Sequence, residues 1–178
     1  AAVRGESLAE IAAEVLAPFF EGSGLEQELG AICRDAFDFP LPLKELTANG
    51  ELSVLELFHG PTAAFKDVGA RFLAALMERA LRGSTDTRPL TILVATSGDT
   101  GGAVAAAFHR RRGIRVGVLF PKGQGSPRQQ HQLTCWGDNI RAFEVDGTFD
   151  ECQALVKGAF TDAGLQRRHR LTAANSIN

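Results

Sequence analysis

The stretch "LTILVATSGDTGGAVAAAFHRRRGIRVGVLFP", residues 90–121, decides the fold of this chain. Its apolar run at 90–97 predicts a buried strand, and the small apolar residues at 101–112 predict a helix. A second apolar run at 114–121 predicts another strand. Buried strands that alternate with helices indicate parallel βαβ units, so the chain belongs to the α/β class.

The alternation of strands and helices continues after this unit. Ser126 followed by Pro127 is typical of a helix start, because proline suits the first helical position. The elements predicted beyond residue 121 are a helix at 126–137, a strand at 139–147, a helix at 148–164 and a strand at 169–176. We therefore expect a three-layer fold, in which a twisted parallel sheet has helices on both faces.

A helical leader precedes the α/β region. Ser7 and Glu10 fit a capping box at its start, and Pro18 predicts a break or kink. The elements expected before residue 90 are helices at 6–21 and 24–37, a proline-broken connector at 38–46, a strand at 50–58 and an amphipathic helix at 66–82. We expect residues 1–50 to form a leader that packs on an α/β domain at 51–178.

The composition is that of an ordinary globular protein and excludes several functions. The net charge is −2 with acidic and basic residues interspersed, which argues against a nucleic-acid surface. No apolar run approaches the ~20 residues of a membrane span, so no membrane partner is expected. Three cysteines without CxxC spacing favour a reducing, cytoplasmic location. The four histidines form no ligand-like cluster, so no metal site is predicted.

The segment "TSGDTGG", residues 96–102, follows the first strand of the α/β unit and opens its helix. Ligands of open α/β sheets bind at this carboxyl edge. Ser97 and Thr100 supply hydroxyl groups, and glycines allow backbone N–H groups to approach an anion. The segment lacks the spacing of GxGxxG and the Lys-Ser/Thr of a P-loop. It predicts a phosphate or carboxylate site, or alternatively a glycine-rich helix cap.

A second candidate is "FHGPTAAFKDVGARF", residues 58–72, which places Lys66 at the start of a predicted helix. The positive end of the helix dipole and removal from water both disfavour an ammonium group. A neutral amine suits the Schiff-base chemistry of lysine. Phe65 would form a flat apolar wall, and Gly60 with Pro61 a rigid turn. The alternative is a solvated surface lysine.

Several motifs together resemble the threonine synthase family, which consists of pyridoxal-phosphate enzymes of the tryptophan-synthase β-chain fold type, fold type II. The resembling stretches are "FHGPTAAFKD", "ATSGDTGGA", "PKGQGSPRQQHQLTCWGDNI", "EVDGTFDECQALVK" and "TAANSIN". They occur in family order from about residue 52 to the end. The chain begins without methionine and ends without a helix-stop signal, so we expect a fragment. The resemblance implies the N-terminal part of a two-domain enzyme.

The resemblance implies a role for each matching residue. Lys66 would form the Schiff base with pyridoxal 5'-phosphate and then move protons. Phe65, Asp99 and Asn178 would contact the cofactor, and Asn175 belongs to the same final motif. The residues implied around the substrate carboxylate are Ser97, Gly98, Asp99, Thr100 and Gly101. The cofactor phosphate would sit in a later glycine-rich loop, which these residues do not contain.

The implied reaction, the last step of threonine biosynthesis, converts O-phospho-L-homoserine and water to L-threonine and phosphate. Lys122 is a candidate for binding the substrate phosphate. A related lyase, such as a serine/threonine dehydratase or a phospho-lyase, is the alternative within enzymes. A non-catalytic anion-binding module, or an inactive fragment, is the alternative outside them. The sequence leaves open whether the protein is a monomer or a homodimer.

Overall fold

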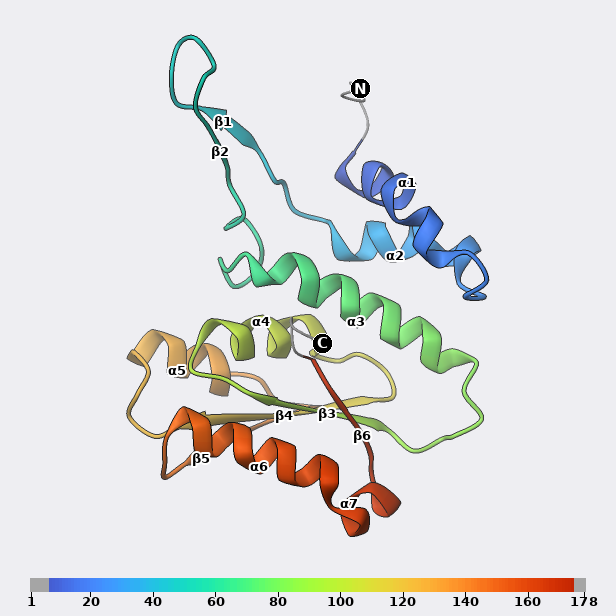
Figure 1. Cartoon of the computed structure of the whole chain (residues 1–178), viewed down its shortest axis with the longest axis vertical. Coiled ribbons are helices and arrows are strands. Elements are labelled where there is room, and N and C mark those ends of the chain that lie inside the picture. The colour runs from blue at the N-terminus through green and yellow to red at the C-terminus, as the bar shows by residue number, and fades with distance from the viewer. Residues whose placement is uncertain (1–6, 175–178) are drawn as a thin grey trace.

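A four-stranded parallel sheet lies at the centre of the computed structural model, which describes residues 7–174 (Figure 1). The strands are β3 (Leu90–Ala95), β4 (Ile114–Pro121), β5 (Ile140–Val145) and β6 (Arg170–Ala173). Their order in the sheet is β5-β4-β3-β6, and every neighbouring pair is parallel. The predicted α/β class and parallel sheet are confirmed.

Helices cover both faces of the sheet, as expected. Helices α3 (Lys66–Arg82), α4 (Asp99–Phe108) and α5 (Pro127–Thr134) lie on one face in Figure 1. Helices α6 (Phe149–Thr161) and α7 (Ala163–Arg168) lie on the other. Alternate strand side chains, among them Ile92 and Val116, form the core with Phe108 of α4. None of the helices within residues 7–174 combines the length and the apolar character needed to cross a membrane.

The leader consists of α1 (Leu8–Phe20), a 3-10 turn at Glu26–Glu28 and α2 (Leu29–Ala36). Phe72 of α3 stacks on Phe37 and meets Phe20 edge to face, so the leader packs on the outer side of α3. The capping box of Ser7 and Glu10 is confirmed. A break at Pro18 is wrong, because α1 continues to Phe20, and the alternative of a kink there stays a prediction. Pro18 has no backbone N–H, so α1 loses one hydrogen bond there and ends two residues later.

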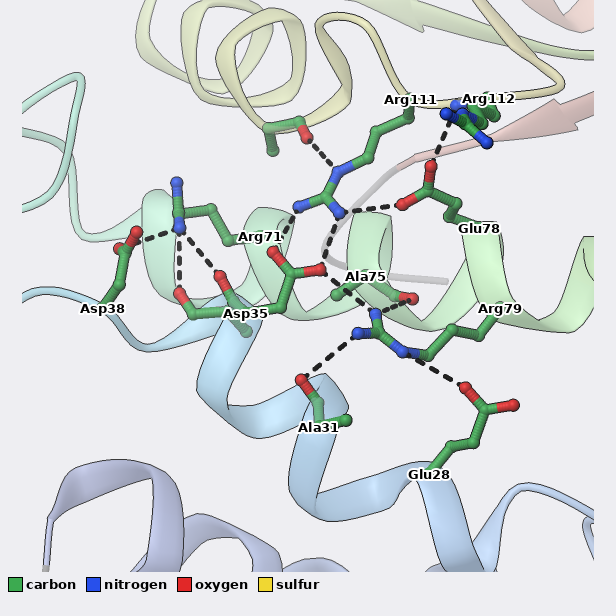
Figure 2. Close-up of polar contacts among 12 residues, drawn as sticks. Glu28, Ala31, Asp35, Asp38, Arg71, Ala75, Glu78, Arg79, Arg111 and Arg112 are labelled. Atoms are coloured by element: carbon green, nitrogen blue, oxygen red, sulfur yellow. Dashed lines mark hydrogen bonds and ion pairs between the residues drawn. The ribbon is translucent and has the colours of Figure 1, made fainter.

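Ion pairs also join the leader to the α/β region (Figure 2). Arg111, which follows α4, donates hydrogen bonds of 2.7 and 2.9 Å to Asp35 of α2 and one of 3.0 Å to Glu78 of α3. Arg79 of α3 donates to the same Asp35 carboxylate at 3.1 Å. The bonds from Arg111 and then Arg79 lower the pKa of Asp35 to about 2, although its partial burial opposes them. This carboxylate of α2 is therefore a charged link to α3 and to the segment that follows α4.

An antiparallel hairpin separates the leader from α3. It pairs β1 (Leu43–Glu45) with β2 (Ser53–Leu55) and extends away from the helices in Figure 1. The connector predicted at 38–46 therefore contains a strand. That strand was not predicted because the two prolines of the segment indicated irregular structure. The strand predicted at 50–58 is real but shorter. The domain limits of 1–50 and 51–178 stay a prediction.

Helix α4 ends four residues before the predicted end at 112. Arg110 adopts a left-handed conformation with φ of 61° and stops the helix after Phe108. The Asn139 side chain accepts from the Arg110 N–H and donates to the Phe108 carbonyl. A residue 31 positions away thus caps this helix.

Candidate functional site

The carboxyl edge of β3 is the point where the strand order reverses. The chain moves from β3 to β4 and β5, and α6 then returns it to β6 on the other side of β3. Ligands of open α/β sheets bind at such a reversal point, just beyond the strand ends. The turn at 96–102 follows β3 at this place.

Thr96 organises this turn from inside the protein. It is 1% exposed, and its hydroxyl oxygen accepts hydrogen bonds of 3.0 Å from the Gly98 N–H and 2.9 Å from the Gly101 N–H. The same hydroxyl donates to the Gly98 carbonyl at 3.1 Å. Two of the backbone donors that sequence reasoning assigned to an anion are therefore used within the turn.

Gly101 brings α4 close to its neighbours. A Cβ atom at this position would lie 2.3 Å from Cγ2 of Thr96 and 2.8 Å from Cδ2 of Leu133. Real Cβ atoms essentially never approach so closely. Gly98 and Gly101 are both buried, so they shape the turn from within.

Ser97, Asp99 and Thr100 form the accessible side of the turn. Ser97 and Asp99 are exposed, and Thr100 is partly exposed. Asp99 and Thr100 begin α4, and the first N–H groups of a helix have no acceptor inside it. These donors and the positive end of the helix dipole favour an anion at this edge.

Lys66 reaches the same edge by a different route. It is the first residue of α3, and α3 runs back toward the start of β3, so its N-terminus lies at the carboxyl edge of the sheet. The C-terminal ends of α3 and α4 also meet, because Glu78 accepts hydrogen bonds from Arg111 and Arg112. The two helices are therefore roughly parallel and start at one end (Figure 1).

The Lys66 side chain is half-buried beside an aromatic ring. Its Nζ lies 4.3 Å from the centroid of the Phe65 ring, which is 60% exposed. No ion pair joins Lys66 to a carboxylate within the described part of the chain. The Phe65 ring therefore lies beside the Lys66 amine, and no acid within residues 7–174 pairs with that amine. The role of the ring as a wall for the cofactor stays a prediction.

Helix α5 connects the loop at residues 60–65, which precedes Lys66 and is called the lysine loop, with the turn after β3. The Gln132 amide donates a long hydrogen bond of 3.5 Å to the Thr62 carbonyl, and the Gln129 amide donates one of 3.4 Å to Asp99. Gln129 also completes the predicted helix start, because it forms a capping box with Ser126. One helix thus contacts both segments that carry the candidate residues.

The other candidates lie around this edge or outside the described residues. Lys122 is exposed just after β4. Asn175 and Asn178 fall outside residues 7–174. His59 stacks on Phe58, and its Nε2 lies 2.6 Å from Glu56.

Two residues inside the quoted motifs received no role from sequence reasoning. Thr96 lies near the end of the strand predicted at 90–97, and Asp67 follows the lysine. Both are buried polar residues, and each holds one of the two site segments through hydrogen bonds. A buried polar residue next to a candidate site is the signal that could have found them, but burial cannot be read from the motif alone.

Residues 39–175 match the family described as pyridoxal-phosphate dependent enzyme. The chain is 46% identical over 171 residues to threonine synthase of Haemophilus influenzae, an alignment that covers 96% of this chain and 39% of that relative. It therefore spans about two fifths of the length of the curated relatives that it matches.

Solved structures give the same result. The pyridoxal-phosphate-bound threonine synthase of Brucella melitensis superposes with a TM-score of 0.87 at 42% identity, covering 99% of this chain and 39% of that chain. Threonine synthase of Escherichia coli superposes with a TM-score of 0.84 at 42% identity, covering 97% of this chain and 39% of that chain. The fold of this chain is thus that of a part of these enzymes.

Proposed function

Because the chain belongs to the family of pyridoxal-phosphate dependent enzymes, we propose that it is part of a threonine synthase. The complete enzyme would convert O-phospho-L-homoserine and water to L-threonine and phosphate. The observation that carries the proposal is the position of Lys66 and the 97–101 turn at one edge of the sheet, where α5 contacts Thr62, in the loop before Lys66, and Asp99 of the turn.

The residues at this edge fit pyridoxal phosphate. The cofactor needs an amine that can bond to its aldehyde, and Lys66 offers one that is half-buried and engaged by no acid within residues 7–174. Bound pyridoxal phosphate supplies that aldehyde and a ring that takes up the electron pair released at the substrate Cα. Phe65 would lie against the cofactor, and Asp99 near its phenolic edge. Neither Phe65 nor Asp99 belongs to a loop that would bind the cofactor phosphate. The relatives are longer than this chain, and their additional length can contain that loop.

The turn at 97–101 would hold the substrate carboxylate. The N–H groups of Asp99 and Thr100 and the hydroxyl of Ser97 would donate to it, while Gly98 and Gly101 keep the turn in shape. The Asp99 side chain faces Gln129 and leaves its own N–H for the substrate. Anchoring the carboxylate fixes which bond of Cα is broken, since reactivity depends on orientation.

Lys66 would then move protons on one face of the substrate. Its amine takes the proton from Cα and next one from Cβ, which allows phosphate to leave Cγ. A proton is returned to Cγ, a water oxygen bonds to Cβ, and reprotonation of Cα gives threonine. Lys122, exposed after β4, is a candidate partner of the departing phosphate. The cytoplasmic location and the choice between monomer and homodimer stay predictions.

Product analysis tests this function. The full-length enzyme, loaded with pyridoxal phosphate, is incubated with O-phospho-L-homoserine, and threonine and phosphate are quantified. Equal amounts of the two products are expected, and Lys66→Ala should abolish both. Phosphate accompanied by a ketoacid in place of threonine would show that the enzyme is a related lyase and would overturn the assignment.

A further inference from the structure

Asp67, the residue after the candidate lysine, is a fully buried carboxylate at 0% exposure. One oxygen accepts a hydrogen bond of 2.8 Å from the Thr62 N–H, and the other accepts one of 2.7 Å from the Thr62 hydroxyl. No ion pair to Asp67 is formed within residues 7–174. Both oxygens of a buried acid are thus devoted to one residue of the lysine loop.

The position of Asp67 in the helix stabilises its negative charge. It is the second residue of α3, where the positive end of the helix dipole stabilises a carboxylate. A buried carboxylate also needs hydrogen-bond donors to offset its loss of water, and Thr62 provides two. Loss of either donor would leave an uncompensated polar group in the interior.

The loop that Asp67 holds is strained. Ala63 has a left-handed backbone with φ of 59°, a conformation that is unfavourable for a residue with a Cβ. A Cβ atom at Gly60 would lie 2.5 Å from an oxygen of Asp67, so the loop closes tightly on the carboxylate. Such a conformation persists only where the surroundings fix it.

We propose that Asp67 and Thr62 are positioning residues that hold the 60–65 loop and thereby set the approach of the Lys66 amine to its cofactor. Adjacent helical side chains point about 100° apart, so Asp67 acts through Thr62 and the loop rather than on Lys66 directly. Thr62 is also where α5 meets the loop, because its carbonyl accepts the bond from Gln132. The inference rests on the proposed function only in that Lys66 is taken to carry pyridoxal phosphate.

The rate of cofactor attachment tests this role without any substrate. Full-length apoenzyme is mixed with pyridoxal phosphate, the rise of visible absorbance is followed by stopped flow, and borohydride reduction confirms the bond to Lys66. Thr62→Val removes the hydroxyl, and we expect attachment per folded molecule to slow at least tenfold, since small misplacements of a reacting group are costly. Thr62→Ser restores the hydroxyl and should return the rate to within about twofold of the original.

A matched control and a second variant keep the test decisive. Thr161→Val removes a hydroxyl on α6, on the other face of the sheet, and should leave the rate unchanged. Asp67→Asn keeps the shape of the side chain but replaces one acceptor by a donor, and it should also slow attachment. If Thr62→Val does not fold, the attachment rate of Asp67→Asn serves as the test.

The outcomes separate this inference from the proposed function. A merely structural role would lower the melting temperature of Thr62→Val while folded molecules attach the cofactor at the original rate, and this result would overturn the inference. A slowed attachment in an enzyme that does not make threonine would instead support the inference and reject the proposed substrate.

Discussion

Gln132 and Thr62, 70 residues apart in sequence, are joined by a hydrogen bond from the Gln132 amide to the Thr62 carbonyl. Gln129, one turn earlier on α5, makes the corresponding bond to Asp99. Through these two side chains α5 sets the spacing between the lysine loop and the turn after β3.

Replacing Gln132 should therefore impair catalysis more than stability. Gln132→Met keeps the length of the side chain but removes the donor. We expect kcat/KM of the full-length enzyme to fall about fivefold, because one long neutral hydrogen bond contributes on the order of 1 kcal/mol. Gln130→Met is the control, since Gln130 points from the same helix to Glu144. Equal effects of the two substitutions on kcat/KM would reject the bridging role of Gln132.

Substitutions in the turn at 97–101 should affect the substrate more than the cofactor. Ser97→Ala removes a hydroxyl that would donate to the substrate carboxylate, and Asp99→Ala removes the acceptor through which Gln129 contacts the turn. We expect kcat/KM to fall by about five- to thirtyfold, corresponding to about 1 to 2 kcal/mol, while cofactor affinity changes less than twofold. Steady-state kinetics and a cofactor titration measure the two effects. A larger loss of cofactor affinity would place the cofactor phosphate in this turn.

Gly101→Ala should destabilise the protein through overpacking. The added methyl group would lie 2.3 Å from Cγ2 of Thr96, the residue whose hydroxyl holds the turn. We expect the free energy of unfolding to drop by about 1 to 3 kcal/mol in denaturant titrations. Gly158→Ala in α6 is the matched control, because nothing lies within 4 Å of its added Cβ. That control should gain up to about 1 kcal/mol, as alanine favours helices, and a comparable loss in both variants would disprove the packing argument.

The link between the leader and the α/β region should weaken in acid. Arg111 and Arg79 lower the pKa of Asp35 to about 2 from its ordinary value of 3.8, so folding favours the ionised carboxylate. Its stabilisation is complete well above pH 4 and is lost as the pH falls toward 2. Because Asp35 is partly exposed, this loss amounts to about 1 to 2 kcal/mol.

Asp35→Asn removes the titrating group and so tests this assignment. Denaturant titrations at pH 6 and pH 3 should show a smaller loss of stability on acidification in Asp35→Asn than in the original protein. Glu14→Gln, which changes an exposed carboxylate of α1, should keep the original pH dependence. An unchanged pH dependence in Asp35→Asn would mean that the ion pairs do not contribute to folding.

Local sequence signals predicted the parts of the fold that local interactions determine. The start of α3 at Lys66 and the limits of β4 agree with the predicted ranges, because helical and strand periodicity is clear there. The end of α4 was predicted wrongly because Asn139, far along the chain, caps it. The short strand β1 was missed because nearby prolines indicate a connector.

The residues of the candidate site could be proposed from the sequence, but the residues that hold them in place could not. Lys66 and the turn at 97–101 follow from motifs and from the rule that ligands bind at strand ends. The Thr96 hydroxyl accepts hydrogen bonds from two N–H groups of that turn. This role requires Thr96 to be buried, and no motif shows that it is. The same holds for the buried carboxylate of Asp67.

The most direct test of the central claim is to locate the cofactor on the chain. The full-length enzyme is loaded with pyridoxal phosphate, reduced with borohydride and digested, and the modified peptide is identified by mass spectrometry. We expect a pyridoxyl group on Lys66 and loss of the visible absorbance on reduction. Modification of Lys44, Lys122 or Lys157 instead, or of no lysine in this chain, would contradict it.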